Sequence, residues 1–219
     1  GLTVAVSAPA QAAAVSAALV GPRPNATRVD FPVGDRVAAS VDVGTGNLLV
    51  TTTELSVPGI GSDVQFGMVF NSLLLAPGSP LPAGGGGYGW ATRLGQDTKL
   101  VANSDGTVLY FAPGGTQGTY VPTSSGASTY TTPAGFKNTL VKTGTGWSLT
   151  DHDTGSVSAF TTTGTLTTVT DRNGQATTLT YAGGSVASIT STRGGAAART
   201  LSMTVAYARV GTVTQGNDL

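Results

Sequence analysis

The sequence predicts an all-β fold built from antiparallel strands and tight turns. Threonine accounts for about one residue in six, and threonine and valine both fit the pleated, half-buried surface of a strand. The 32 glycines supply turns between strands. Two of the good helix formers are scarce, since the 219 residues include three lysines and one glutamate. Turn residues recur every eight to twelve positions beyond Ala38, which is the spacing of a sandwich, a barrel or an extended sheet.

The first twenty residues carry no charge and are rich in alanine and serine. Ala8-Pro9-Ala10 and Ala10-Gln11-Ala12 each fit the small-x-small pattern of a secretory cleavage site. We favour the remnant of an export signal over a flexible tail or a weak amphipathic helix at 10–20. A membrane span is not expected, because the segment is too rich in alanine and serine and Pro9 interrupts it. This interpretation predicts a secreted or cell-surface bacterial protein.

Residues 21–37 are predicted to form a proline-rich linker or an extended lead-in. Pro22, Pro24 and Pro32 each lack the backbone N–H that a sheet ladder requires. From Ala38 onward the pattern changes to one strand after another, with a turn at 58–61, a Pro- and Gly-rich loop before residue 88, and a tight turn at Asn103–Gly106. The expected strands cover residues 47–57, 64–71, 88–93, 97–102, 106–112, 118–122, 127–132, 138–143, 146–151 and 155–161.

A short unit recurs in the last third of the chain. Leu166-Thr-Thr-Val169-Thr returns as Val186-Ala-Ser-Ile189-Thr and again as Val210-Gly-Thr-Val213-Thr, at offsets of 20 and 24 residues. An aromatic residue precedes each copy. A period near 20 is typical of stacked arrays, in which each hairpin buries its apolar face on its neighbours. The predicted structural core of the repeats is Phe160, Leu166, Val169, Tyr181, Val186, Ile189, Tyr207, Val210 and Val213.

These repeats resemble those of the YD-repeat, or Rhs, family. The stretch 164–181, which runs from Gly-Thr-Leu through Val-Thr-Asp and Asn-Gly to Tyr181, follows the family pattern, and 146–151 resembles the segment before it. Upstream, Val41–Leu48, the Pro58-Gly59 turn, Phe70-Asn71-Ser72 and Gly89-Trp90 resemble the N-terminal domain that precedes the first repeats. The resemblance spans about residues 40–214. It departs where the family has aspartate after the aromatic, because this chain has Thr161, Ala182 and Ala208.

The resemblance implies a particular organisation and role. Residues 38–112 would form the N-terminal domain, and 113–219 would form YD-like repeats. Family repeats coil into a β-sheet shell that encloses a C-terminal toxin, or they form a large surface scaffold. The chain would therefore be a structural wall segment, whose partners are the rest of a longer parent chain and an enclosed toxin domain. The family's self-cleavage aspartates have no counterpart before Leu219, so no catalytic residue is carried over.

The residues offer little for other kinds of chemistry. Eleven basic residues balance eleven acidic ones, which argues against a nucleic-acid scaffold. There is no cysteine and one histidine. The cluster Asp151-His152-Asp153 is expected to be a polar hairpin tip, because alternation on a strand separates the histidine from the two carboxylates. Gly84–Gly87 lacks the lysine of a phosphate loop, and Asp171–Gly174 is expected to contain a type I′-like turn at Asn173-Gly174. We therefore predict no metal, no cofactor and no enzymatic activity.

Two binding features complete the expectation. An open strand array has unpaired edges, which predicts self-association through the C-terminal edge near 209–214. The alternative function is a cell-surface carbohydrate-binding or self-assembling adhesion module. In that alternative, exposed aromatic rings would stack on sugars, and Trp90 and Trp147 are the candidates.

Overall fold

The computed structural model of the chain describes residues 26–57, 64–75, 89–192, 199–206 and 209–217, with side chains up to residue 202. Within these residues the fold is all-β, as predicted, and neighbouring strands run antiparallel in every sheet. The helical elements in the described part are two short 3₁₀ turns, η2 (Ser72–Leu75) and η3 (Pro113–Gly115). The predicted signal remnant at 1–20 lies outside the described residues.

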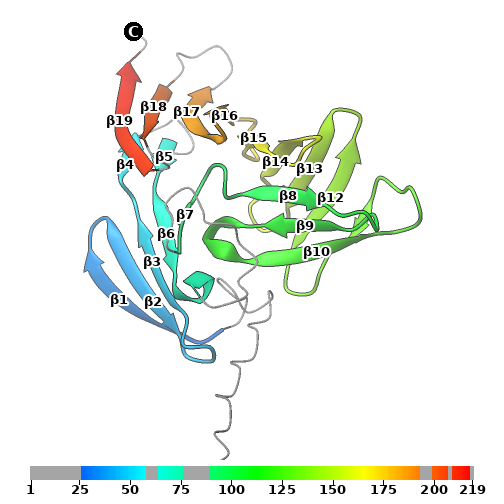
Figure 1. Cartoon of the computed structure of the whole chain (residues 1–219), viewed down its shortest axis with the longest axis horizontal. Helices are drawn as coiled ribbons and strands as arrows, with labels where there is room; N and C mark the ends of the chain where they lie inside the picture. Colours follow the sequence, from blue (N-terminus) through cyan, green and yellow to red (C-terminus); the bar gives the residue numbers. More distant parts are fainter. Residues whose placement is uncertain (1–25, 58–63, 76–88, 193–198, 207–208, 218–219) are drawn as a thin grey trace, which may run out of the picture.

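The N-terminal half forms a five-stranded sheet in the order β1-β2-β3-β6-β7 (Figure 1). Its strands are β1 (Arg28–Gly34), β2 (Val37–Asp42), β3 (Leu48–Thr52), β6 (Met68–Asn71) and β7 (Trp90–Thr92). Of the linker and the extended lead-in expected at 21–37, the second half of the segment fits the lead-in and not the linker, because it forms β1 and starts β2. Pro32 is compatible with this strand because β1 is an edge strand, and the pairing with β2 is irregular between Pro32 and Gly34.

A small two-stranded sheet continues two of these strands. It contains β4 (Leu55–Val57) and β5 (Val64–Phe66), which extend β3 and β6 beyond a break. Gly67 lies at the break, where a Cβ atom would stand 2.1 Å from the carbonyl oxygen of Thr52. The runs predicted as single strands at 47–57 and 64–71 are therefore each split in two, at 53–54 and at Gly67.

A four-stranded sheet follows, in the order β11-β10-β9-β8. Its strands are β8 (Lys99–Ala102), β9 (Val108–Phe111), β10 (Gln117–Pro122) and β11 (Tyr130–Thr131). The turn predicted at Asn103–Gly106 joins β8 to β9, and the N–H of Gly106 donates to the carbonyl of Asn103 over 3.1 Å. η3 connects β9 to β10 and contacts β6 and β7 of the five-stranded sheet.

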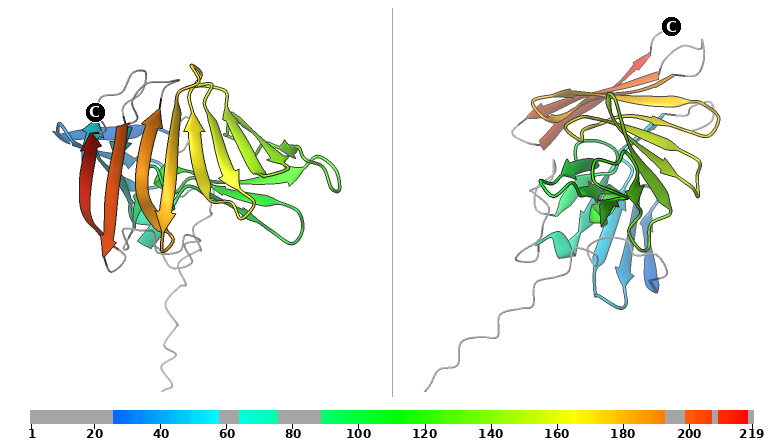
Figure 2. Two further views of the ribbon diagram at one scale, coloured as in Figure 1. Left: turned by 90° about the horizontal axis from the view of Figure 1, so that it is seen from above. Right: turned by 90° about the vertical axis from the view of Figure 1, so that its right-hand side faces the viewer.

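The C-terminal half is one eight-stranded sheet whose spatial order is the order of the chain. Figure 2 shows strands of this sheet side by side. Its first strand lies beside the four-stranded sheet through the Thr129–Val141 bridge, and its last strand, β19, is an edge. The strands are β12 (Asn138–Thr143), β13 (Gly146–Asp151), β14 (Val157–Thr161), β15 (Leu166–Thr170), β16 (Ala176–Ala182), β17 (Ser185–Thr192), β18 (Arg199–Ala206) and β19 (Arg209–Asn217).

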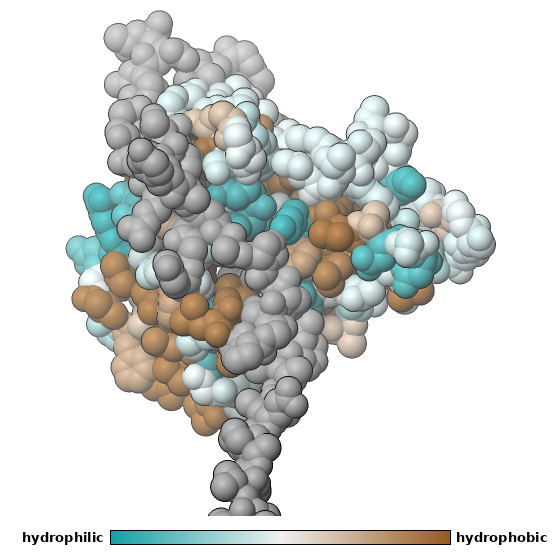
Figure 3. All heavy atoms as spheres, viewed as in Figure 1, coloured by the Kyte–Doolittle hydropathy of each residue, from teal (hydrophilic) through white to brown (hydrophobic). Residues whose placement is uncertain are grey.

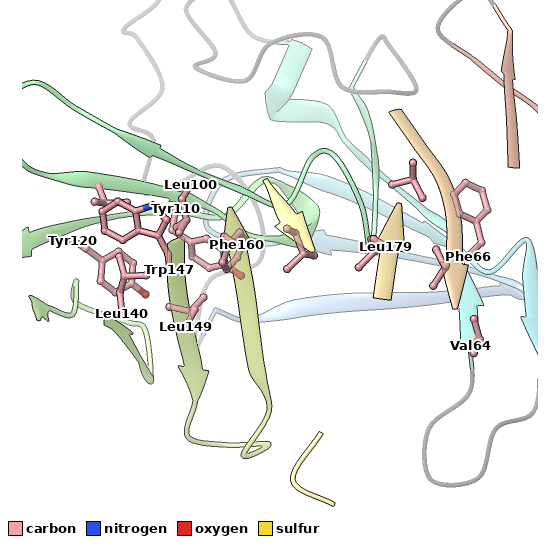
Figure 4. Packing of buried hydrophobic residues seen from close by; sticks show 14 of the residues in the cluster. Val64, Phe66, Leu100, Tyr110, Tyr120, Leu140, Trp147, Leu149, Phe160 and Leu179 are labelled. Atoms are coloured by element: carbon pink, nitrogen blue, oxygen red, sulfur yellow. The ribbon is translucent and has the colours of Figure 1, made fainter. Parts of the chain in front are cut away.

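One hydrophobic core joins the sheets. Apolar side chains from the inner face of the eight-stranded sheet pack against strands β8 to β10 and against the β4–β5 hairpin (Figure 4). The ring of Tyr110 meets the rings of Tyr120 and Phe160 edge-on, both at 6.4 Å between centroids. Leu140 and Ile189 are fully buried. A backbone hydrogen bond of 2.9 Å from the N–H of Leu100 to Gly164 fastens the four-stranded sheet to the array.

The outer face of the eight-stranded sheet carries hydroxyl side chains. Thr168, Thr178, Thr190 and Thr200 are successive cross-strand partners on β15 to β18. The hydroxyls of Thr190 and Thr200 lie 3.1 Å apart, within hydrogen-bond distance. This face is therefore suited to water, whereas the inner face is suited to the core.

Candidate functional site

The cluster Asp151-His152-Asp153 is a hairpin tip, and its three side chains have separate local partners. Asp151 ends β13, and its carboxylate accepts hydrogen bonds from the N–H and the hydroxyl of Thr154 at 2.7 and 2.8 Å. His152 Nε2 lies 2.8 Å from the hydroxyl of Thr139. Asp153 forms an exposed ion pair of 3.1 Å with Lys137. Among the described residues no group of three His, Cys, Asp or Glu side chains could hold a metal ion.

Aspartates recur in the turns as hydrogen-bond acceptors for backbone N–H groups. The carboxylate of Asp42 accepts from Gly44 and Thr45, and that of Asp171 accepts from Asn173 and Gln175. In the latter turn the N–H of Gly174 donates to the carbonyl of Asp171 over 3.0 Å, and Gly174 has a φ of +79°. The turn thus has Arg172 and Asn173 at its centre, followed by a left-handed glycine. The expected type I′ turn centred on Asn173-Gly174 was wrong, because Asp171 starts the turn one residue earlier.

This turn geometry shifts the acidity of two carboxyls. For Asp151, burial raises the pKa, but hydrogen bonds donated by Thr154 and by the Asp153 N–H outweigh it and hold the pKa below its ordinary value. For the exposed Asp105, hydrogen bonds from Thr107 lower the pKa. Both carboxylates are stabilised in the charged, hydrogen-bond-accepting form. Such a shift fits a structural role in turns, and a general acid would need the opposite direction.

The two tryptophans lie in different environments. Trp147 is 5% exposed and packs on Tyr130, at 5.6 Å between ring centroids, inside the core. Trp90 is half-buried on β7, with its ring 5.4 Å from that of Phe70. A sugar platform needs an accessible aromatic face, so Trp147 does not provide one, while Trp90 belongs to a larger apolar surface described below.

The residues predicted as the repeat core lie on β14 to β19 or just outside them. Phe160, Leu166, Val186 and Ile189 are buried, and Val169 and Tyr181 are partly buried against the same core. Val210 and Val213 belong to β19, where side chains are not described, and Tyr207 lies outside the described residues. The Tyr181 hydroxyl donates a 2.6 Å hydrogen bond to the carbonyl of Leu166. Burial, followed by the charge of Asp97, raises the pKa of Tyr181, so this hydroxyl keeps its proton and its donor role.

A small hollow lies near the junction of the sheets. It is lined by Gln65, Gly67, Arg93, Leu94 and Thr177 and has a volume of about 190 Å³. Pockets that enclose small ligands are usually about 300–1,000 Å³. The Gly84–Gly87 segment lies outside the described residues. This hollow is therefore smaller than a typical ligand pocket.

Two surfaces have a clear structural basis for interaction. The first is the edge of β19, a nine-residue strand that, among the described strands, pairs with β18 alone. The second is a row of apolar residues that crosses the whole five-stranded sheet as successive cross-strand partners. We call this second surface the apolar row. It consists of Phe31, Ala39, Val50, Phe70 and Trp90.

The β1 end of the apolar row is exposed to solvent although its side chains are hydrophobic. Phe31 is 49% exposed. Val29 and Val33, which lie two residues before and after it on β1, are 46% and 64% exposed. Hydrophobic atoms gather in Figure 3 over the part of the molecule where Figure 1 places β1, β2 and β3. Single exposed apolar side chains are ordinary, but a contiguous set marks an interaction surface.

Sequence reasoning missed the β1 part of this surface. The assignment of 21–37 to a linker gave weight to its prolines. The signal was nevertheless present in Val29-Asp30-Phe31-Pro32-Val33, where apolar residues occupy every second position. Such alternation is typical of a strand with one apolar face, and Pro32 indicates that the strand lies at an edge.

Comparisons with known proteins add no relative. No model of a known protein family matches the chain, and no curated protein matches it. Across the described residues, no helix has the length and apolar character needed to cross a membrane.

Proposed function

We propose that this chain is a structural wall segment of a secreted YD-repeat, or Rhs-like, protein, with an enclosing or scaffolding role and no catalysis of its own. The observation that carries the proposal is the eight-stranded sheet, in which every strand pairs with its neighbours in the chain and β19 is an edge. Such a sheet can be lengthened hairpin by hairpin without rearranging what is already formed. Its apolar inner face and hydroxyl outer face match a wall that separates a core from water.

The local chemistry also supports a structural role. Aspartates that could have served catalysis accept backbone hydrogen bonds in turns. The aromatic hydroxyl of the repeat, on Tyr181 of β16, donates to the backbone of β15, the other strand of the same hairpin. Turn aspartates and an aromatic that closes the hairpin both support a structural role for the repeat.

The edge of β19 provides the experiment. Size-exclusion chromatography with light scattering, over about a hundredfold range of concentration, should show association of the isolated chain, because an unpaired edge recruits another strand. The backbone N–H groups of consecutive residues in β19 point alternately toward β18 and toward the unpaired edge. A proline at Thr212 or at Val213 removes one of these N–H groups, so one of the two variants loses an N–H at the unpaired edge. One of the two variants should therefore stay folded and become monomeric. A clean monomer for the unmodified chain at every concentration contradicts the proposal.

The native protein gives an independent measurement. Its intact mass, taken from the source with the secreted fraction included, should lie far above the 21.7 kDa of this chain. A native mass near 21.7 kDa would contradict the proposal that the chain is part of a larger shell. Self-assembly through the edge of β19 would then be the remaining function.

A further inference from the structure

The side chains of the apolar row are half-buried on the inner strands of the sheet and exposed on β1. Met68 and Phe70 are two residues apart on β6 and so face the same side of the sheet. Met68 is partly buried against the hydrophobic core, and Phe70 and Trp90 are half-buried as well. Farther across the sheet, on β1, Phe31 is 49% exposed. Coverage therefore decreases with distance from the core.

The covering layer at the buried end includes the eight-stranded sheet. Strands β17 and β18 contact β5, which continues into β6 past Gly67. Val64 and Phe66 on β5 are 1% and 2% exposed and belong to the same core as Leu179 and Ile189 of the array. The array therefore lies over the β5 end of the sheet, and it stops at β19.

We propose that the apolar row is the surface against which further antiparallel hairpins pack when they extend the array at the edge of β19. The occupant is a β-sheet layer of the same chemistry as β16 and β17, with Leu and Ile on one face and Thr and Ser on the other. This inference rests on the proposed function, because it takes the β19 edge to be the growing end of a wall. It adds a partner surface on the N-terminal sheet, so that the two halves of the chain hold the extension together.

Strand spacing sets the size of the occupant. Three strand-to-strand steps separate β6 from β1, which at about 4.8 Å per step is about 14 Å. Four added strands extend a sheet by about 19 Å. Two hairpins are therefore enough to carry the layer from β19 across the uncovered face to β1.

The dimensions argue against a second copy as the occupant. Five strands about 4.8 Å apart and about 17 Å long present a footprint of about 400 Å². A stable association between two proteins buries about 800 Å² on each partner. Hairpins attached to β19 can pack stably with a smaller buried area than two separate proteins need, because they belong to the same chain and their effective concentration is high.

Chemical labelling gives a direct test, since the chain contains no cysteine. Phe31→Cys places one thiol on the exposed end of the apolar row, and Asp30→Cys places one on the opposite face of the same strand as a control. Each variant is made in the full chain and in an extended chain, in which a second copy of residues 171–217 follows Leu219. Maleimide labelling rates and backbone hydrogen exchange are measured in all four proteins.

The proposal expects labelling at position 31 to slow about tenfold or more in the extended chain, while labelling at position 30 is unchanged. It is overturned if β19 becomes protected from hydrogen exchange but position 31 still labels at its original rate. If β19 gains no protection, the proposed function fails instead. A shorter extension with residues 171–192 adds one hairpin and keeps the test decisive if the longer one misfolds. Labelling at position 31 that slows with concentration in the unextended chain indicates a second copy and also overturns the proposal.

Discussion

The eight-stranded array and the five-stranded sheet each bury one face, but their other faces differ. In the array the second face carries Thr168, Thr178, Thr190 and Thr200, whose hydroxyls suit water. In the five-stranded sheet the second face carries the apolar row, whose exposure to water is unfavourable. A sheet with an apolar face on both sides is incomplete by itself. The outer face of the array thus suits water, whereas the five-stranded sheet exposes apolar side chains, which is the basis of the proposal that another layer covers it.

The largest expected effect concerns the buried face of the array. Ile189→Ala should lower the free energy of unfolding by about 2–5 kcal/mol, because it leaves a cavity where the side chain is fully buried. Thr178→Ala, on the exposed face of the adjacent strand β16, should change it by less than about 0.5 kcal/mol. Urea unfolding followed by tryptophan fluorescence measures both. Equal losses in the two variants would mean that the faces are not distinct.

The second prediction concerns the connection between the array and the four-stranded sheet. Gly164 and Gly174 occupy similar turns with φ of +84° and +79°, but a Cβ at Gly164 would lie 2.0 Å from the carbonyl oxygen of Leu100, while Gly174 has nothing within 4 Å. Gly174→Ala should cost about 1 kcal/mol of backbone strain. Gly164→Ala should cost about 3 kcal/mol or more, because strand β8 must also move. Thermal or urea unfolding measures the loss of stability in each variant. Equal losses would contradict the steric explanation for Gly164.

The third prediction concerns the apolar row itself. Phe31→Ser should change the free energy of unfolding by less than about 1 kcal/mol, because the ring is already 49% exposed. It should also lower the fluorescence of the dye ANS, which binds exposed apolar surface. Thr178→Val adds an apolar group to the outer face of the array at one isolated position, and it should leave ANS fluorescence unchanged. A loss of several kcal/mol for Phe31→Ser would show that the row is buried in solution.

The smallest expected effect is a pH dependence at the tip of the β13–β14 hairpin. The folded-state pKa of Asp151 lies below its ordinary value of 3.8. The associated stability is therefore present above the unfolded pKa of about 4 and is lost as pH falls through the folded pKa. The urea midpoint of Asp151→Asn should lie slightly below that of the unmodified chain at about pH 7, and the gap should close toward about pH 3. A gap that widens in acid would contradict the assigned sign.

The sequence predicted the array well and the five-stranded sheet less well, for a physical reason. In the array each strand pairs with its chain neighbour, so alternation and turn residues such as Asp171–Gly174 carry the information locally. In the five-stranded sheet, β6 pairs with β7, which follows it in the chain only after residues 72–89, and no local pattern encodes that pairing. The apolar row follows from the pairing of Phe31 with Ala39, of Ala39 with Val50 and of Val50 with Phe70. It could not be assembled before the sheet order was known.

The sequential order of β12 to β19 also has a kinetic consequence. Every strand of the array finds its partners within the adjacent hairpins, so the loops that must close are short and the contacts are local. Local contacts favour fast folding, and domains form from the N-terminus as a chain emerges from synthesis. The array can therefore form progressively, each hairpin using the preceding one as its template. Each new edge is open only until the next hairpin emerges, which limits the time available for aggregation.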